Sequence, residues 1–306
     1  MSYLTHLTRQ DLFELYERIA KTQTLLMGTP IPGVLCLSTS KPGPQVGIMA
    51  CTHGNEPAGL AAFAYLLEHA EALQCGTVYL ILNNLAAARR YFEQATDLSF
   101  TAHYRFVDRD MNRVYPQWQQ DQSAETDRVH TLLPLFKTLD VVLDLHSTSA
   151  PSDPMLVLLA DAHQGLEIPG VHIILQNLIP HLNAPPLVSL CEKAEAFVLE
   201  TGSHEDARSL LIAQAAVQTL LVNQGILSAE ISSERSSAAS QTAVYDVYQS
   251  IVFPHESYSL LELIPNLGFL PRGTLLARSE AGLPDIVVDR DAYAVMPPAR
   301  LKPVLP

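Results

Sequence analysis

Basic side chains are scarce in this chain. Its 306 residues include 19 lysines and arginines against 32 aspartates and glutamates, which gives a formal net charge of −13. Proteins that bind nucleic acids use Lys and Arg to neutralise phosphates, so a nucleic-acid partner is not expected. A small anionic substrate remains compatible with this composition, because a few arginines in a cleft set the local potential.

The chain also lacks the marks of a secreted or membrane-spanning protein. Its first residues contain no apolar stretch of the secretory type. The most apolar late run, Leu210–Val222, is interrupted by two glutamines and is too short to cross a bilayer. The four cysteines are scattered with no C-x-x-C pair, so no disulfide framework or cysteine zinc site is predicted. We therefore expect a cytoplasmic protein with buried thiols and no membrane partner.

Several common catalytic signatures are missing as well. The sequence has no G-x-x-x-x-G-K-[ST] and no G-x-G-x-x-G, so nucleotide-dependent chemistry is disfavoured. It has no H-E-x-x-H and no G-x-S-x-G, which disfavours a zincin and a serine hydrolase.

What the chain does have is enough apolar sequence for a large core, with hydrophobic residues making up 48%. Near-continuous apolar runs such as Gln45–Cys51, Thr77–Leu82 and Asp140–Leu145 alternate with helical segments such as Pro57–Leu73. This alternation predicts an α/β fold with a mixed, mainly parallel sheet and helices on both faces.

The composition changes in the last quarter of the chain. Residues 228–241 are rich in serine and resemble a linker, and short β-like runs separated by Pro and Gly follow from Tyr245. We therefore predict two domains, a catalytic one over 1–227 and a small β-rich one over 242–306.

Two histidines and a glutamate form a candidate metal site. His53 and Glu56 lie three residues apart directly after an apolar strand, and His146 closes another such strand. Ligands bind at the carboxyl ends of strands in open α/β sheets, and two His with one carboxylate form a common catalytic zinc set. Asp144 shares a strand face with His146 and could orient its ring. The alternative is a buried, hydrogen-bonded histidine at a strand end.

Two further segments carry charged side chains. The stretch 105–113 holds three arginines and Asn112, which could bind a carboxylate or stabilise an oxyanion, or could simply form a solvated loop. Glu200 ends another apolar strand, where a carboxylate near a metal-bound water could act as general base. A solvated glutamate is the simpler interpretation of that position.

Taken in order, the segments THGNE, DRDMNR, DLHST and E-T-G resemble the aspartoacylase and succinylglutamate desuccinylase family, a branch of the zinc carboxypeptidase clan. The resemblance implies a zinc carboxypeptidase-like fold, with one zinc ion per chain held by His53, Glu56 and His146. It implies further roles for five residues. These are Glu200 as general base and acid, Arg105 polarising the scissile carbonyl, Asn112 and Arg113 binding a substrate carboxylate, and Tyr293 closing the pocket from the second domain.

One departure from the family bears on the substrate. Aspartoacylases have an additional arginine about ten residues before the catalytic glutamate, whereas Pro186–Leu199 contains none and has Lys193 as its only basic residue. The preceding stretch, 172–186, is apolar apart from His172, His181 and its Asn and Gln side chains. This favours a less charged substrate than N-acetylaspartate.

The leading hypothesis is a zinc amidohydrolase that cleaves an N-acyl amino acid, a small anionic substrate. A metallocarboxypeptidase acting on short peptides and a non-catalytic binding protein on the same scaffold are the alternatives. Neither a metal ligand nor the general base is missing, which favours catalysis. The ligand set would also accept cobalt, iron or nickel, and the sequence leaves open whether the chain forms a homo-oligomer.

Overall fold

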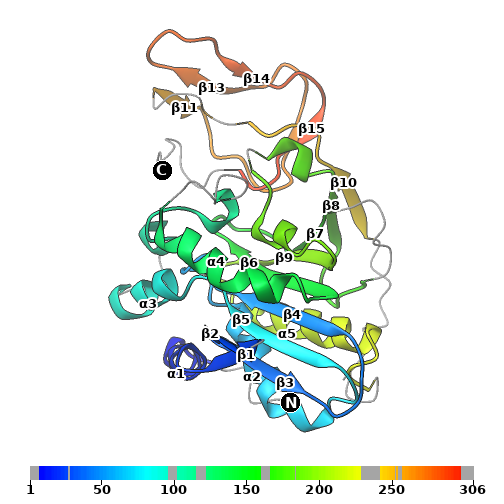
Figure 1. Ribbon diagram of the computed structural model, residues 1–306. Helices are drawn as coiled ribbons and strands as arrows, with labels where there is room; N and C mark the ends of the chain where they lie inside the picture. Colours follow the sequence, from blue (N-terminus) through cyan, green and yellow to red (C-terminus); the bar gives the residue numbers. More distant parts are fainter. Residues whose placement is uncertain are drawn as a thin grey trace.

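An eight-stranded sheet forms the centre of the computed structural model, which describes residues 7–26, 28–95, 102–114, 122–159, 166–182, 184–228, 242–251, 253 and 257–297 (Figure 1). In spatial order its strands are β10 (Ala243–Asp246), β8 (Ile173–Gln176), β7 (Met155–Leu158), β9 (Glu195–Ser203), β6 (Val141–Thr148), β4 (Gln45–Ala50), β5 (Thr77–Leu82) and β3 (Val34–Ser38). All pairings are parallel except β7 with β9 and β3 with β5. The predicted mixed, mainly parallel sheet is confirmed.

Helices cover both faces of this sheet. The described helices are α1 (Arg9–Ala20), α2 (Gly59–Glu68), α3 (Leu85–Gln94), α4 (Ala124–Phe136) and α5 (Arg208–Asn223). One core cluster joins the sheet to α1, α2, α3 and α5, and a second joins its other face to α4. Alternate residues of the central strand β4 enter the two clusters, with Ile48 in the first and Met49 in the second. This explains why its sequence is apolar without a break.

Local signals fix several helix ends. The side chain of Thr8 accepts a hydrogen bond from the Asp11 amide while the Asp11 carboxylate accepts one from Thr8, a capping box that starts α1. Ser123 and Asn84 cap α4 and α3 in the simpler way, each through one side-chain oxygen. None of the helices in the described part of the chain is long and apolar enough to cross a membrane.

The C-terminal residues form small antiparallel sheets beside the main one. Strands β11 (Tyr258–Leu260), β13 (Leu275–Ser279) and β14 (Ile286–Val287) form one, and β12 (Phe269–Leu270) pairs with β15 (Ala292–Tyr293) in another. A further hairpin, β1 (Gln23–Leu26) with β2 (Thr29–Pro32), lies near the N-terminus. The β-rich character predicted for the C-terminal region is confirmed.

Strand β10 differs from its predicted place. It follows residues 228–241, yet it pairs in parallel with β8 and forms the edge of the main sheet. Its Tyr245 packs against the second core cluster, and this contact stabilises β10 at the edge of the main sheet. The division into domains over 1–227 and 242–306 stays a prediction, and most of the predicted linker lies outside the described residues.

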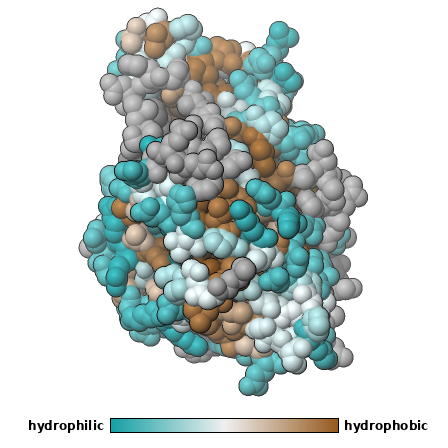
Figure 2. All heavy atoms as spheres, in the orientation of Figure 1, coloured by the Kyte–Doolittle hydropathy of each residue, from teal (hydrophilic) through white to brown (hydrophobic). Residues whose placement is uncertain are grey.

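The C-terminal β-rich region leaves much apolar surface uncovered. Figure 2 shows hydrophilic side chains over most of the main body on this face and hydrophobic ones in the C-terminal region and along the middle of the molecule. Most of the exposed large hydrophobic side chains, including Leu263, Phe269 and Val287, belong to this region. Its own buried cluster is small, with Tyr258, Leu260 and Ala277 at the centre.

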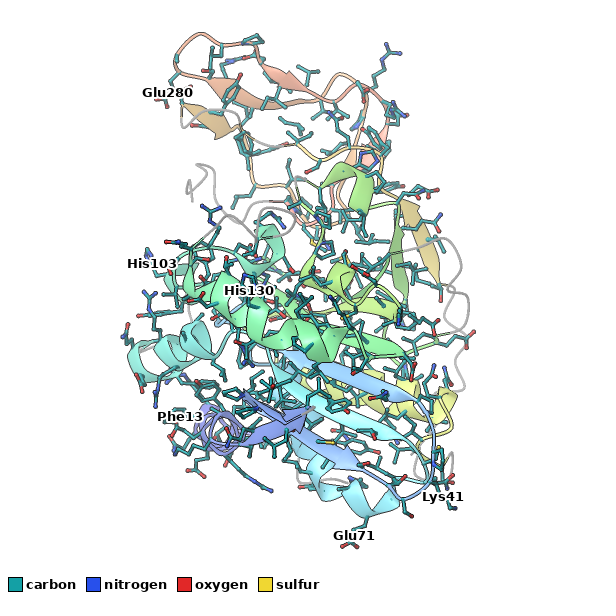
Figure 3. The ribbon with its side chains drawn as sticks, in the orientation of Figure 1. Phe13, Lys41, Glu71, His103, His130 and Glu280 are labelled. Atoms are coloured by element: carbon teal, nitrogen blue, oxygen red, sulfur yellow. The ribbon has the colours of Figure 1, made fainter. Side chains whose placement is uncertain are left out.

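The strand order places a ligand site at one edge of the sheet. The chain leaves β4 to form β5 on one side and later β6 on the other, so the carboxyl end of β4 is a topological switch point. Lys41, shortly before β4, and Glu71 lie at the end of the molecule opposite the C-terminal β-rich region (Figure 3). The carboxyl ends of β4, β6 and β9 therefore face that region.

Candidate active site

A tight loop carries His53 and Glu56 out of β4. Cys51 has a φ of 54°, a left-handed conformation that is strained for a residue with a side chain. Gly54 follows, and a Cβ there would lie 2.3 Å from the carbonyl carbon of Ala87 and 2.5 Å from the carbonyl oxygen of Tyr104. Only glycine lets the loop approach this backbone, and its amide donates to the carbonyl of Arg105 at 2.9 Å. The loop is thereby joined to the arginine-rich segment.

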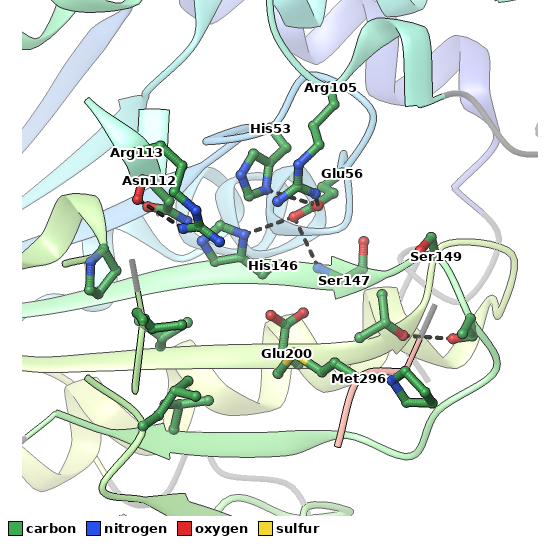
Figure 4. Close-up of a pocket in the computed structure, with 18 of the residues that line it drawn as sticks. His53, Glu56, Arg105, Asn112, Arg113, His146, Ser147, Ser149, Glu200 and Met296 are labelled. Carbon is green, nitrogen blue, oxygen red and sulfur yellow. Dashed lines mark hydrogen bonds and ion pairs between the residues drawn. The ribbon is translucent and has the colours of Figure 1, made fainter. Parts of the chain in front are cut away.

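The three predicted metal ligands meet at this point. Glu56 lies between the two imidazoles, with Oε1 2.9 Å from His53 Nδ1 and Oε2 2.8 Å from His146 Nδ1. One ligand atom from each residue lies within 4.8 Å of the others, and all three residues are buried. The group could hold a metal ion, as Figure 4 shows from the way both rings turn one nitrogen toward the same carboxylate.

The other nitrogen of each ring is held by its own carboxylate. His53 Nε2 lies 3.0 Å from Asp110 Oδ1, and His146 Nε2 lies 2.9 Å from Asp144 Oδ2. With Nε2 donating to a carboxylate, Nδ1 carries the lone pair that a metal needs, the usual arrangement around metal-binding histidines. The donor set and its supporting carboxylates therefore fit a zinc ion.

The electrostatics of the group favour a bound cation. Burial lowers the pKa of His146, but Asp144 and Glu56 outweigh it and raise that pKa well above its ordinary value. Burial raises the pKa of Glu56, and the two histidines outweigh it and hold that pKa well below its usual range. Three carboxylates thus surround two rings, and positive charge at the Nδ1 atoms is stabilised.

Arg105 lies against the same carboxylates. Its NH1 is 2.8 Å from Glu56 Oε1 and its Nε is 3.2 Å from Asp110 Oδ2, while its side chain keeps 34% exposure. The guanidinium therefore sits beside the metal group with part of its surface open toward the cavity, where a developing negative charge would be stabilised.

A buried glutamate that sequence reasoning missed shapes the arginine-rich loop. Glu125, fully buried at the start of α4, accepts hydrogen bonds from the backbone amides of Val107, Asp108 and Arg109 at 2.7, 3.1 and 3.1 Å. Asn84 donates to the same carboxylate at 3.0 Å. No motif marks Glu125, since three of its partners are backbone amides 16 to 18 residues away in sequence and the fourth, the side chain of Asn84, is 41 residues away.

Asn112 and Arg113 lie in a 3-10 turn, Met111–Arg113, at the far end of this loop. Asp110 starts the turn by accepting from the Asn112 amide at 2.8 Å, and Asn112 Oδ1 accepts from the backbone amide of Leu187 at 2.8 Å. Among the described residues no carboxylate lies within ion-pair distance of Arg113. Both residues line the cavity, with the guanidinium of Arg113 available to an anionic ligand.

Glu200 faces the metal group from the next strand. It stands opposite His146 in the β6–β9 register and lines the same cavity (Figure 4). Its Oε2 is buried without a hydrogen-bond partner in the described part of the chain. Burial, with the negative charge of Glu56 adding to it, raises the pKa of Glu200 to about 7, against the opposing effect of His146, His53 and Arg105. That value suits proton transfer near neutral pH.

The remaining predicted residue, Tyr293, is not brought to the cavity. It is half exposed on β15, with its ring 5.5 Å from that of Tyr245 and 5.4 Å from that of Phe269. Met296 and Pro297, which follow it in the chain, line the cavity instead. The substrate-binding role of Tyr293 stays a prediction.

His204 is connected to the site by a hydrogen bond with Ser147. The Ser147 hydroxyl lies 2.7 Å from His204 Nδ1, and the Ser147 amide donates to Glu56 Oε2 at 3.3 Å. Among the described residues that line the cavity, the histidines are His53 and His146. His130, by contrast, is exposed on α4 (Figure 3).

The cavity that these side chains line measures about 250 Å³. This is somewhat below the ~300–1,000 Å³ common for ligand pockets, a size that fits a small molecule better than a long peptide. Its described lining combines the buried group of His53, Glu56 and His146, the guanidinium of Arg105, Glu200 with its buried Oε2, and the guanidinium of Arg113 further along.

The catalytic-domain model of the succinylglutamate desuccinylase/aspartoacylase family matches residues 42–224, more than half of the chain. The protein belongs to this family. It is accordingly a hydrolase of the desuccinylase and aspartoacylase type, and the predicted membership is confirmed. No curated protein matches the chain in sequence.

Solved structures share the fold of this family member. The succinylglutamate desuccinylase of Chromobacterium violaceum is 20% identical with a TM-score of 0.61, covering 87% of this chain and 90% of that one. A succinylglutamate desuccinylase/aspartoacylase of Rhodobacter sphaeroides is 17% identical with a TM-score of 0.59, covering 90% and 87%. Murine aminoacylase 3 is 18% identical with a TM-score of 0.53, covering 84% and 91%.

Proposed function

We propose that this protein is a zinc-dependent hydrolase that cleaves the amide bond of an N-acyl amino acid. The observation that carries the proposal is the orientation of the two imidazoles. Both Nδ1 atoms converge on Glu56 within hydrogen-bond distance, while Asp110 and Asp144 hold both Nε2 atoms. A metal-binding role accounts for all four contacts at once.

A zinc ion held by His53, Glu56 and His146 would supply a water of pKa about 7 and polarise the scissile carbonyl. Glu200, with its pKa of about 7, takes the proton from the attacking water and later gives it to the leaving amine. Arg105 stabilises the negative charge that develops on the carbonyl oxygen. Asn112 and Arg113 bind the carboxylate of the amino acid and so fix the position of the amide.

The experiment is a measurement of free-amine release from N-acetyl, N-succinyl and longer N-acyl amino acids by the zinc-loaded protein. We expect release from at least one substrate, its loss with a chelator and its return with zinc. Glu200→Gln should retain zinc and lose turnover by roughly 100-fold or more. Glu192→Gln, at an exposed position beyond the cavity, is the matched control and should remain active. Amine release that persists in Glu200→Gln would contradict the role of Glu200 as general base. Amine release that the chelator does not reduce would contradict metal dependence.

A further inference from the structure

The part of the sheet that forms the floor of the cavity is polar on one side of Glu200 and apolar on the other. On β6 and β9 the residues of this face include His146 and Glu200, which stand opposite each other in register. On the next strand, β7, Val157 stands opposite Val198. Because residues two apart share a face, Val198 and Glu200 point the same way. The polar half of the floor therefore gives way directly to an apolar half.

The apolar half extends into a wall. Six apolar residues line the cavity there, and we call them the apolar wall: Val157, Leu159, Leu178, Leu182, Pro186 and Val198. Val157 and Val198 are 2% and 8% exposed, so the floor of this wall is part of the protein core. Every charged or histidine side chain among the described lining residues belongs to the catalytic group already assigned, apart from Arg113. With Arg113 taken by the substrate's α-carboxylate, no further described lining residue offers a charge to balance a second ionised group placed against the wall.

The apolar wall lies on the side of the cavity that binds the amino acid. Pro186 precedes Leu187, whose amide donates to Asn112 Oδ1 at 2.8 Å, so the wall is continuous with the carboxylate-binding pair. In Figure 4, Asn112 and Arg113 lie on one side of His146 and Glu200, and Ser149 and Met296 lie on the other. The acyl group would occupy the second side, among the small residues 147–150.

We infer that the amino-acid part of the substrate has an uncharged apolar side chain, of the size of leucine, methionine or phenylalanine, which packs on the apolar wall. The inference rests on the proposed function, and it names the substrate class of that same site. An apolar side chain is stabilised in proportion to the apolar surface it buries there. A carboxylate in the same place would lose its hydration with no partner to replace it. The α-carboxylate remains on Arg113.

The test compares N-acetyl-leucine, N-acetyl-methionine and N-acetyl-phenylalanine with N-acetyl-aspartate and N-acetyl-glutamate on the zinc-loaded protein. We expect kcat/KM for the best apolar substrate to exceed that for either acidic one by roughly tenfold or more. Binding is measured separately, as the thermal stabilisation of zinc-loaded Glu200→Gln by the same compounds. That readout distinguishes selectivity from catalysis.

A variant that introduces a positive charge sharpens the comparison. Leu178 lies at the partly exposed rim of the wall, so Leu178→Arg places a cation there without burying it fully. We expect this variant to lose selectivity for the apolar substrates by roughly tenfold and to gain on N-acetyl-aspartate. Leu211→Arg, at a 41% exposed position on α5, adds the same charge away from the cavity and should leave the selectivity unchanged.

The outcomes separate the two proposals. Faster cleavage of the acidic substrates would overturn the apolar class while supporting the amidohydrolase function. Preferential stabilisation by the apolar compounds without cleavage of any would support the apolar wall and overturn the proposed function. Absence of both binding and cleavage, or equal binding of both classes, would overturn the inference.

Discussion

Substituting Glu200 by glutamine should change how the stability of the metal-free protein depends on pH. The carboxyl of Glu200 has an ordinary pKa of 4.5, which burial, the largest cause, raises to about 7 in the folded protein. The folded state therefore binds this proton more tightly than the unfolded state does. The stability that protonated Glu200 contributes to the wild type is lost as the pH rises from 4.5 through 7, because the ionised carboxylate is destabilised in the fold. Glutamine keeps the shape and cannot ionise.

The size of the effect follows from these two pKa values. Each pH unit between them corresponds to about 1.4 kcal/mol, so the difference in unfolding free energy between variant and wild type should grow by at most about 3.5 kcal/mol. The residue is partly exposed to the cavity, and solvent there brings the expected value closer to about 2 kcal/mol. The growth should be complete slightly above pH 7, with the variant the more stable protein there.

The assay is urea unfolding of chelator-treated wild type and Glu200→Gln at a series of pH values from 4.5 to 8.5. Groups far from Glu200 titrate alike in both proteins, so the difference between the two curves reports on Glu200 together with the charged groups that face it. Glu192→Gln, at an exposed position, should follow the wild-type curve at every pH. A difference that stays constant across this range, or that shrinks as the pH rises, would refute the argument that burial governs this carboxyl.

Two other substitutions test the surroundings of the metal group. Asp144→Asn should weaken zinc binding by roughly 10- to 100-fold in a competition with a chromophoric chelator, because Asp144 orients His146 through Nε2. Asp153→Asn, at an exposed position, is the control. Unchanged zinc affinity in Asp144→Asn would show that the contact does not orient the ring. Glu125→Gln should lower the free energy of unfolding, measured by urea denaturation, by about 1–3 kcal/mol. The reason is that an amide nitrogen replaces one of the oxygens that accept hydrogen bonds from the amides of residues 107–109. A stability equal to that of the wild type would contradict the anchoring role of Glu125.

The sequence alone was sufficient for the central strands and for the candidate metal ligands that belong to them or follow them. Strand β5 spans the predicted Thr77–Leu82, and β4 and β6 begin within one residue of the predicted positions. Buried parallel strands are apolar on both faces, which makes them recognisable without any knowledge of their neighbours. His53, Glu56, His146 and Glu200 could be named because each follows or ends an apolar run of the sequence, although β6 and β9 continue past His146 and Glu200 to Thr148 and Ser203.

Other elements were not among those predicted. Helix α4 buries Val129, Leu132 and Phe136 at helical spacing, so a signal was present, whereas β1 to β3 are short strands that run among prolines and glycines. Strand β10 was predicted with the C-terminal β-rich region, whereas it pairs with β8 in the main sheet, because an edge strand of four residues carries no signal in its own sequence for the sheet that it joins.

Residue types and spacing thus determined the strand-end motifs, the donor chemistry and the family. The tertiary structure alone decided which nitrogen of each histidine faces Glu56 and which carboxylates hold the other. It also brought Glu125 to the arginine-rich loop, set Met296 in the cavity in place of Tyr293, and joined residues from β7, β9 and the segment before Leu187 into the apolar wall. These contacts join residues far apart in the chain, and their geometry arises only when the sheet order and the loop packing are fixed together.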